Sequence, residues 1–247
     1  MSAAMNRLIA EAGLLLQTSR KTVALTGAGV STESGIPDFR GRNGLWSRYD
    51  PMEYGTIGAF RRNPRKIWKM LAELLDIANA RPNAGHYAMA GLEEEKLLTG
   101  IITQNIDGLH QKAGSRRVVE FHGSITSFSC QSCGNSYALE DIVRMPLPPS
   151  CRRCASILKP DVVFIDEQIP AETLRDMEEL LQGTEVLLVA GTSCQMAPAS
   201  FIPARVRLHG GSIIEINREP ALGGLSEITM ATGFSKAMTG ILSAIRT

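Results

Sequence analysis

Four of the five cysteines are arranged as two Cys-x-x-Cys pairs, a pattern typical of a metal site. Cys130 and Cys133 form the first pair, seventeen residues follow, and Cys151 and Cys154 form the second pair. Four thiolates at this spacing suit a closed tetrahedral zinc ribbon, and their neighbours offer neither an open coordination position nor a general base. We therefore expect one structural Zn²⁺ at these cysteines. A zinc ribbon can also bind nucleic acid, but a net charge of +1 gives that function no support.

A glycine-rich stretch follows a short apolar run. Residues 22–26 read Thr-Val-Ala-Leu-Thr, which predicts a buried parallel strand, and Gly27 and Gly29 come directly after it. Glycines in this place let the backbone turn tightly and approach a phosphate. Thr32 stands where the dehydrogenase fingerprint has a third glycine or alanine, so hydride transfer is disfavoured. Because Pro37 bars an ordinary helix, we expect an irregular lid next; a glycine turn without a ligand is the plainer alternative.

Polar side chains follow a second expected strand, residues 97–103. They are Gln104, Asn105 and Asp107, and they come just after the strand's carboxyl end, where open α/β sheets bind ligands. Three adjacent hydrogen-bonding groups could bind a ribose or a carboxamide. An ordinary Asx-type turn would need the same residue types, so both interpretations stay open on this stretch alone.

A histidine ends a third expected strand over residues 118–123. His122 lies beside a glycine and directly before the cysteine module, and its imidazole suits general-base chemistry near neutral pH. A single histidine is more often a surface or core residue. We assign such ordinary places to His86 and His209.

Helices and strands alternate through the rest of the chain, which favours an α/β fold with a Rossmann-like, doubly wound parallel sheet. Hydrophobic spacing predicts helices over residues 6–17, 85–95, 171–182, 198–208 and 235–246, and one that begins at Asn63-Pro64 and ends before Pro82. Further strands of the large sheet are expected at 161–165, 185–190 and 212–217.

The composition is that of a globular protein. With 247 residues, of which 44% are hydrophobic and 21% charged, the chain can bury one large core and a smaller module. No secretory segment or membrane span is expected, and we expect neither nucleic acid nor a membrane as a partner. Paired cysteines that favour metal over disulfides indicate a cytoplasmic protein.

The glycine-rich stretch resembles the signature of the sirtuins, the NAD-dependent protein-lysine deacylases. Residues 27–41 read Gly-Ala-Gly-Val-Ser-Thr-Glu-Ser-Gly-Ile-Pro-Asp-Phe-Arg-Gly, and Gly-Leu-Trp follows at 44–46. Thr-Gln-Asn-Ile-Asp-Gly-Leu-His at 103–110 is similar to the second sirtuin motif, and the His-Gly pair at 122 and the four cysteines match in the same order. The resemblance covers nearly the whole chain.

This resemblance implies a site made of residues from several motifs. His122 would be the catalytic base, with Asn105 also catalytic; Asp107 would bind the nicotinamide carboxamide, Phe39 would shield the ribosyl centre, and Arg40 would meet phosphate. The residues assigned to NAD binding are Gly27, Ala28, Gly29, Thr32, Ile36, Pro37, Asp38, Phe39, Arg40, Gln104, Asn105, Ile106, Asp107, Gly191, Thr192, Ser193, Asn217 and Ser235.

The substrate peptide, by the same resemblance, would lie as an added strand between two stretches. Val163, Phe164, Ile165 and Met196 are assigned to it. Both stretches depart from the family pattern: residues 165–167 read Ile-Asp-Glu in place of the usual Phe-Gly-Glu, and 194–198 read Cys-Gln-Met-Ala-Pro in place of small aliphatics and a tyrosine. These changes bear on the peptide preference and on the shape of the acyl tunnel.

The prediction is therefore an enzyme of two domains. Residues 1–37, 86–123 and 158–247 would form the NAD-binding domain, and 38–85 with the zinc ribbon 124–157 the small domain. NAD would be the co-substrate and an acyl-lysine protein or peptide the substrate, giving nicotinamide, free lysine and O-acyl-ADP-ribose. Mono-ADP-ribosyl transfer and a non-catalytic NAD- or ADP-ribose-binding module are the alternatives.

Overall fold

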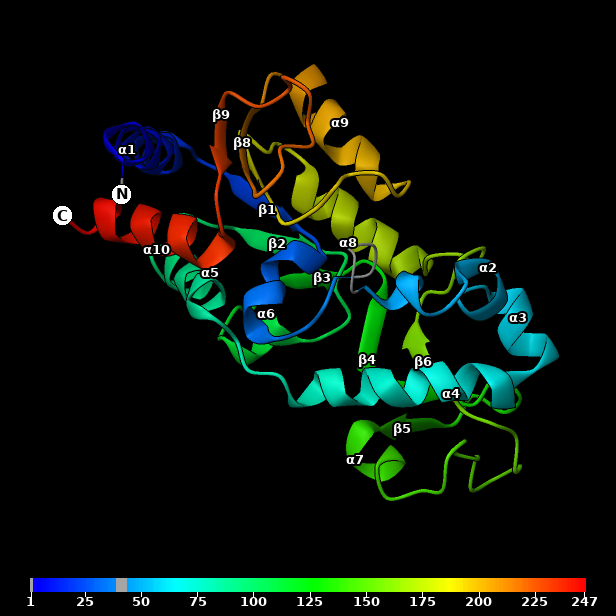
Figure 1. Cartoon of the computed structure of the whole chain (residues 1–247). Helices are drawn as coiled ribbons and strands as arrows, with labels where there is room; N and C mark the ends of the chain where they lie inside the picture. The colour runs from blue at the N-terminus through cyan, green and yellow to red at the C-terminus, as the bar shows by residue number, and fades with distance from the viewer. Residues whose placement is uncertain (1, 39–43) are drawn as a thin grey trace.

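The computed structural model describes residues 2–38 and 44–247, and its main feature is a six-stranded parallel sheet (Figure 1). The strand order is β3-β2-β1-β7-β8-β9, and every neighbouring pair is parallel. The bounds are β1 (Thr22–Thr26), β2 (Gly100–Thr103), β3 (Val118–Glu120), β7 (Val186–Ala190), β8 (Ser212–Asn217) and β9 (Ile228–Ala231). This confirms the predicted doubly wound α/β fold.

The strand order also locates the ligand crevice. From β1 the chain moves outward through β2 to β3, and later returns to the other side of β1 with β7. The direction of winding therefore reverses between β1 and β7, and open α/β sheets bind ligands at the carboxyl ends of strands at such a switch point.

Helices cover both faces of the sheet. Ala24 on β1 packs in one core with α1 (Ala3–Thr18), α5 (Ala84–Glu94) and α10 (Phe234–Ile245). Val23 and Leu25 point to the other face and pack with α8 (Ala171–Leu181) and α9 (Ile202–Leu208) (Figure 1). All five residues of β1 are buried, as expected for a central strand that is covered on both faces.

A second module holds an antiparallel sheet of order β5-β4-β6. It consists of β4 (Gly123–Ser129), β5 (Ser136–Ala138), β6 (Lys159–Val162), α7 (Leu139–Ile142), α2 (Pro51–Tyr54), α3 (Ile57–Arg62) and α4 (Pro64–Leu75). Trp68 on α4 stacks on Phe128 with ring centroids 6.1 Å apart and donates to the Leu158 carbonyl oxygen over 2.8 Å. Helix α4 thus completes an apolar core that the cysteine segment alone lacks.

Helix α4 begins where the sequence predicts. Asn63 caps it by accepting a hydrogen bond from the Lys66 amide, and Pro64 occupies its first turn. Short helices complete the structure: η1 (Ala28–Val30), η2 (Thr32–Ser34), η3 (Leu45–Ser47), η4 (Asp76–Asn79), α6 (Leu109–Lys112) and η5 (Ala199–Phe201). The two 3₁₀ turns η1 and η2 therefore lie just before the segment expected to be an irregular lid.

Two strand predictions need correction. The strand expected over residues 161–165 of the large sheet is β6, which begins at Lys159 and pairs antiparallel with β4 in the small sheet. Its placement was wrong because pairing is decided by partners distant in the sequence. Strand β9 was not predicted; it is four residues long at the sheet edge. The division into domains at residues 38, 86, 124 and 158 stays a prediction.

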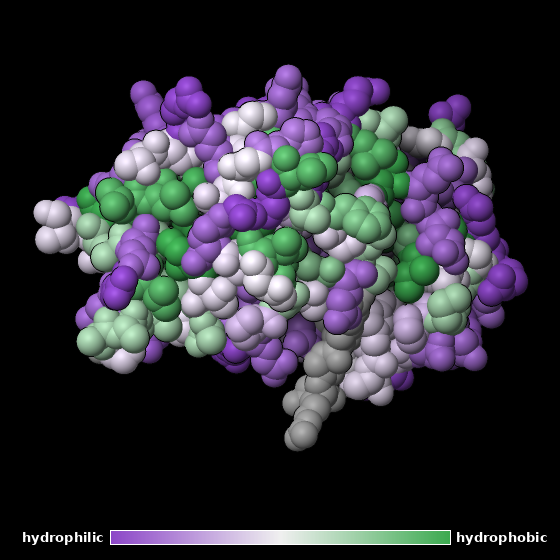
Figure 2. Space-filling model, turned by 90° about the horizontal axis from the view of Figure 1, so that it is seen from above, coloured by the Kyte–Doolittle hydropathy of each residue, from purple (hydrophilic) through white to green (hydrophobic). Residues whose placement is uncertain are grey.

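The surface seen from above carries several separate groups of hydrophobic residues between hydrophilic ones (Figure 2). Such dispersed apolar exposure is normal for a globular protein. Among the described residues, no helix is both long enough and apolar enough to span a bilayer.

Candidate active site

The loops after β1 and β7 pack directly on each other at the switch point. The Gly27 amide donates to the Ala190 carbonyl oxygen over 3.1 Å, and the Gly29 amide to that of Gly191 over 2.8 Å. A Cβ at Gly29 would lie 2.8 Å from the Gly191 Cα, and Gly191 itself has φ +60°. The glycine pair is therefore required by the contact between these loops, a reason that the sequence did not reveal.

Gln104 and Asn217 organise the turn around Thr192. Gln104 Nε2 donates to Thr192 Oγ1 over 2.9 Å. The Thr192 amide donates to Asn217 Oδ1 over 3.1 Å, and Asn217 Nδ2 donates to Thr192 O and Glu215 Oε1. Both amide hydrogens of Asn217 are thus used within the protein, so this side chain holds the loop in shape.

A small buried site lies beside these loops. Ser31 Oγ donates to Asp107 Oδ2 over 2.7 Å, and Asn105 Nδ2 donates to Ser31 Oγ over 3.1 Å. The Leu109 amide donates to Asp107 Oδ1 over 2.9 Å. Burial raises the pKa of the Asp107 carboxyl, while the hydrogen bonds from Leu109 and Ser31 act in the opposite direction. A flat polar group, such as a carboxamide, would find both donors and acceptors here.

Ser31 was missing from the predicted site residues. It is buried and bridges Asp107 to Asn105. Its position inside the Gly-Ala-Gly-Val-Ser stretch could have indicated a site residue. Its hydrogen-bond partner Asp107, however, is 76 residues away in the sequence.

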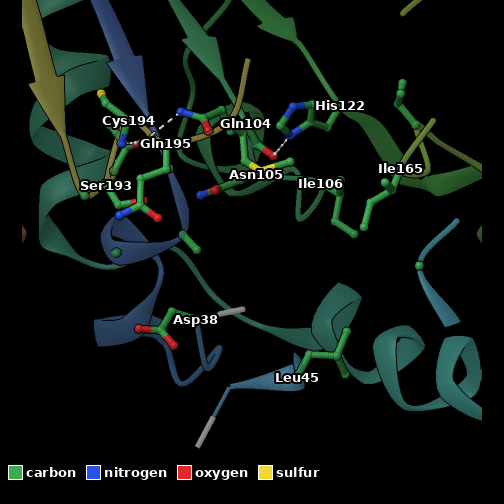
Figure 3. A pocket seen from close by; sticks show the side chains of 18 of the residues that line it. Asp38, Leu45, Gln104, Asn105, Ile106, His122, Ile165, Ser193, Cys194 and Gln195 are labelled. Atoms are coloured by element: carbon green, nitrogen blue, oxygen red, sulfur yellow. Dashed lines mark hydrogen bonds between the residues drawn. The ribbon is translucent and has the colours of Figure 1, made fainter. Parts of the chain in front are cut away.

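His122 follows β3, and one of its ring nitrogens forms a hydrogen bond within the protein. Its Nδ1 lies 3.1 Å from the Gln104 carbonyl oxygen, which can only accept, so Nδ1 carries the proton in the neutral ring (Figure 3). The Nε2 lone pair is then available to take a proton. Burial lowers the pKa of His122, and the bond to Gln104 raises it by less, so the ring is neutral at neutral pH. This is the state that a general base needs.

One cavity of about 1870 Å³ joins these elements. Figure 3 shows Gln104, Asn105 and His122 on one side of it, with Asp38 and Leu45 across from them. Of the predicted residues, those that line this cavity are Gly27, Ala28, Gly29, Thr32, Asp38, Gln104, Asn105, Ile106, His122, Val163, Phe164, Ile165, Gly191, Thr192, Ser193, Met196 and Asn217.

Six predicted residues do not line this cavity or fall outside the described residues. Ile36 and Asp107 line the small neighbouring cavity together with Ser31. Ser235 Oγ donates to Asn83 Oδ1 over 3.0 Å, at the start of α5. Phe39 and Arg40 fall outside the described residues. Pro37 lines neither cavity.

Comparison with known proteins agrees with this geometry. The model of the Sir2 family matches residues 27–198. The chain belongs to the Sir2 family. The NAD-dependent protein deacylase 2 of Pyrobaculum aerophilum is 49% identical over 208 residues, which cover 84% of this chain and 83% of that relative.

Solved Sir2 structures share the whole fold. A Sir2 homologue in complex with NAD has a TM-score of 0.88 at 40% identity and covers 100% of this chain and 94% of its own. A Sir2 protein with a deacetylated p53 peptide and 3′-O-acetyl ADP-ribose has a TM-score of 0.89 at 33% identity, covering 94% of this chain and 96% of its own. The resemblance found in the sequence is therefore confirmed.

The four cysteines of this Sir2 protein are gathered in the geometry of a zinc site. The sulfur of Cys130 lies 3.4 Å from that of Cys154, and Cys133 lies 3.6 Å from both Cys151 and Cys154. All four sulfurs lie within 4.8 Å of one another. Zn–S bonds of about 2.3 Å in a tetrahedron place sulfurs about 3.8 Å apart, so the residues fit a structural Zn²⁺.

We expect Cys130→Ser to lose the metal and to lower the melting temperature of the protein, because zinc binding at such a site contributes folding free energy. Wild type should contain one zinc per chain by metal analysis. Cys194→Ser is the matched control, since Cys194 lies outside the cluster and should leave the zinc content unchanged. A metal-free wild type, or a Cys130–Cys151 disulfide in fresh protein, contradicts the assignment.

The departure from the Sir2 pattern at residue 166 has a visible backbone consequence. Asp166 stands where the family usually has glycine, and it has φ +63°. Aspartate tolerates this left-handed conformation better than most residues, but still at a cost. We expect Asp166→Gly to be more stable than Asp166→Ala by about 1 kcal/mol in urea unfolding. Equal stability of the two variants would show that this turn relaxes when the side chain changes.

Proposed function

We propose that the protein removes acyl groups from lysine side chains of proteins and uses NAD as co-substrate. One observation supports this most strongly: a single cavity is lined by the neutral His122, by the glycine loops at the switch point and by the apolar residues Leu45, Met70 and Leu71. Such a cavity suits a dinucleotide, a base and an aliphatic chain at once. Relatives named NAD-dependent protein deacylase support the proposal.

In this proposal NAD lies along the loops after β1 and β7. The adenosine half is near Thr192 and Asn217, and the nicotinamide enters the small cavity next to Asn105 and Asp107. A Sir2 homologue of the same fold forms a complex with NAD, which supports NAD as the ligand of this cavity.

The reaction would proceed in two stages. The acyl oxygen of the lysine amide attacks the ribose carbon that carries nicotinamide, a C–O bond forms, and nicotinamide leaves with the electron pair of the C–N bond. His122 Nε2 then accepts the proton of a ribose hydroxyl, whose oxygen attacks the acyl carbon. With water as the third reactant, the products balance as free lysine, nicotinamide and O-acyl-ADP-ribose.

The peptide would bind along residues 163–167. The main-chain groups of Ile165, however, already form hydrogen bonds within the protein, which the sequence did not predict. The Ile165 amide donates to the Gly55 carbonyl oxygen, and the Ile165 carbonyl oxygen accepts from the Ile57 amide. The Ile165 N–H is therefore not available to an added strand, and its carbonyl oxygen already accepts one hydrogen bond. Its side chain lines the cavity, so we infer that it contacts the acyl-lysine through apolar packing.

Mass spectrometry of an acetyl-lysine peptide incubated with protein and NAD tests the proposal. We expect a loss of the acetyl mass together with nicotinamide and O-acetyl-ADP-ribose, and no change without NAD. A peptide that gains the mass of ADP-ribose would favour mono-ADP-ribosyl transfer. No product, with NAD bound, would favour a binding module.

A cytoplasmic location stays a prediction that rests on the paired cysteines, which form no disulfide.

A further inference from the structure

Two histidines that no step of the proposed reaction uses are buried against each other behind the site. His86 on α5 is 0% exposed and His110 on α6 is 1% exposed. Their ring centroids are 4.9 Å apart with planes tilted by 59°. Buried imidazoles without partners are costly, so this arrangement calls for a physical reason.

Hydrogen bonds define which nitrogen of each ring carries the proton. The Asn83 amide donates to His86 Nδ1 over 3.3 Å, so that nitrogen is unprotonated and Nε2 carries the hydrogen. Thr26 Oγ1 donates to Thr103 Oγ1 over 2.9 Å and therefore accepts from His110 Nε2, 3.0 Å away. His110 consequently has its proton on Nε2 and a lone pair on Nδ1.

The two remaining ring nitrogens are complementary. His86 Nε2 and His110 Nδ1 are both buried, and neither has a hydrogen-bond partner among the described residues, so the two rings are in contact without a hydrogen bond between them. The first has a proton to donate and the second a lone pair to accept it. We propose that His86 and His110 form a neutral pair with locked tautomers, and that this pair positions Asn105 and the loop after β1 for the reaction.

The pair connects two parts of the site. On one side, Asn83 Nδ2 donates to the Val30 carbonyl oxygen over 2.8 Å and to Ser34 Oγ over 3.0 Å, which holds the loop after β1. On the other side, Thr103 Oγ1 accepts from the Asn105 amide over 3.1 Å. Polar groups thus run from the α5 cap to the two imidazoles, which are in ring contact, and on through two threonines to Asn105.

Uncharged imidazoles suit the position of His86 and His110 behind the site. Burial lowers the pKa of His86 to about 4, opposed in part by Glu33, and lowers that of His110 to about 3, to which His86 adds. An imidazolium near the ribose would oppose the positive charge that develops there as nicotinamide leaves. The pair supplies directional hydrogen bonds without adding charge.

The tautomers are tested by nitrogen NMR of protein labelled at its histidine rings, at neutral pH and without substrate. Both His86 and His110 should be neutral with the proton on Nε2, and comparison with His86→Gln and His110→Gln assigns their signals. A cationic ring, or a proton on Nδ1 of either residue, overturns the proposal. Because this readout needs no turnover, it does not depend on the proposed function.

The positioning role, which rests on that function, is tested with Thr26→Val and the control Thr22→Val. Both threonines are buried on β1, but the Thr22 hydroxyl has no hydrogen-bond partner within residues 2–38 and 44–247. Thr26→Val should lower kcat about 10- to 100-fold with little change in KM for NAD, because a slightly misplaced group costs rate. It should also speed exchange of the His110 Nε2 proton. Thr22→Val should keep wild-type kcat. Equal kcat for the two folded variants overturns the positioning role, whereas an inactive wild type would instead refute the proposed function.

Discussion

We expect His122→Ala to lower the rate of lysine deacylation by about 10²–10⁴-fold, the usual range for a lost general base. The reason is the tautomer of the ring: Nδ1 donates to the Gln104 carbonyl oxygen, so Nε2 keeps its lone pair, and His122 lines the cavity. Binding of NAD should change little, because the loops after β1 and β7 are left in place. Steady-state kinetics with an acetyl-lysine peptide and calorimetry with NAD measure the two effects separately.

His209→Ala is the control, because His209 lies on the surface after α9 and bonds only within its own helix in the described structure. The pH profile adds a second check. Since burial lowers the pKa of His122, the acidic limb of kcat/KM in wild type should have its midpoint below 6.5, the ordinary value for histidine. Near-full deacylation by His122→Ala would show that another group is the base.

We also expect a strong preference for neutral acyl groups, with succinyl-lysine turned over at least about 100-fold less well than acetyl-lysine, equivalent to about 2.7 kcal/mol. By the resemblance to sirtuins, the branch that removes succinyl groups would carry a tyrosine and an arginine where this chain has Leu71 and Leu74. Both leucines are buried in the small module and also line the cavity. They are thus core residues and cavity residues together, and neither can pair with a carboxylate.

Few cationic side chains in the described part of the cavity could pair with the carboxylate of a succinyl group. Arg218, the one lysine or arginine in that part of the cavity, follows β8 and lies 3.9 Å from Glu33. Lys159, beneath Phe164, is already paired with Glu167 over 3.0 Å. An unpaired carboxylate buried here would cost several kcal/mol in practice.

Butyryl-lysine is the matched control substrate, because it has the length of the succinyl group without the terminal carboxylate. We expect kcat/KM for butyryl-lysine to exceed that for succinyl-lysine by at least about 100-fold on one peptide. Comparable values would contradict the prediction and indicate a cationic group outside the described residues.

Much of the fold and of the site could be predicted, because local sequence patterns indicate the strands and the polar residues at their ends. The central strands are short apolar runs, and the polar residues at their ends, such as Gln104 and His122, necessarily meet at one edge of a parallel sheet. The cysteine spacing likewise restricts the metal site. These inferences need only the order of the elements, which the hydrophobic pattern reveals.

What could not be predicted depends on contacts between distant residues. The register of β6 against β4, the bridge from Ser31 to Asp107 and the pairing of His86 with His110 leave no periodic trace in the sequence. His86 was considered ordinary because a lone histidine in a helix carries no sign of its neighbour. The role of Asn217 in holding Thr192 was missed for the same reason.

The order of strands in the large sheet also bears on how the chain folds. β1 pairs with β7 through residues 22 and 186, so the centre of the sheet closes only after most of the chain has been synthesised. The cysteines, by contrast, lie between residues 130 and 154 and can gather early. Because long loops close slowly, we expect pulsed hydrogen exchange to protect β4 and β5 before β1. The ribbon would then be an early folding unit, and the cleft would come into existence only in the last step of folding.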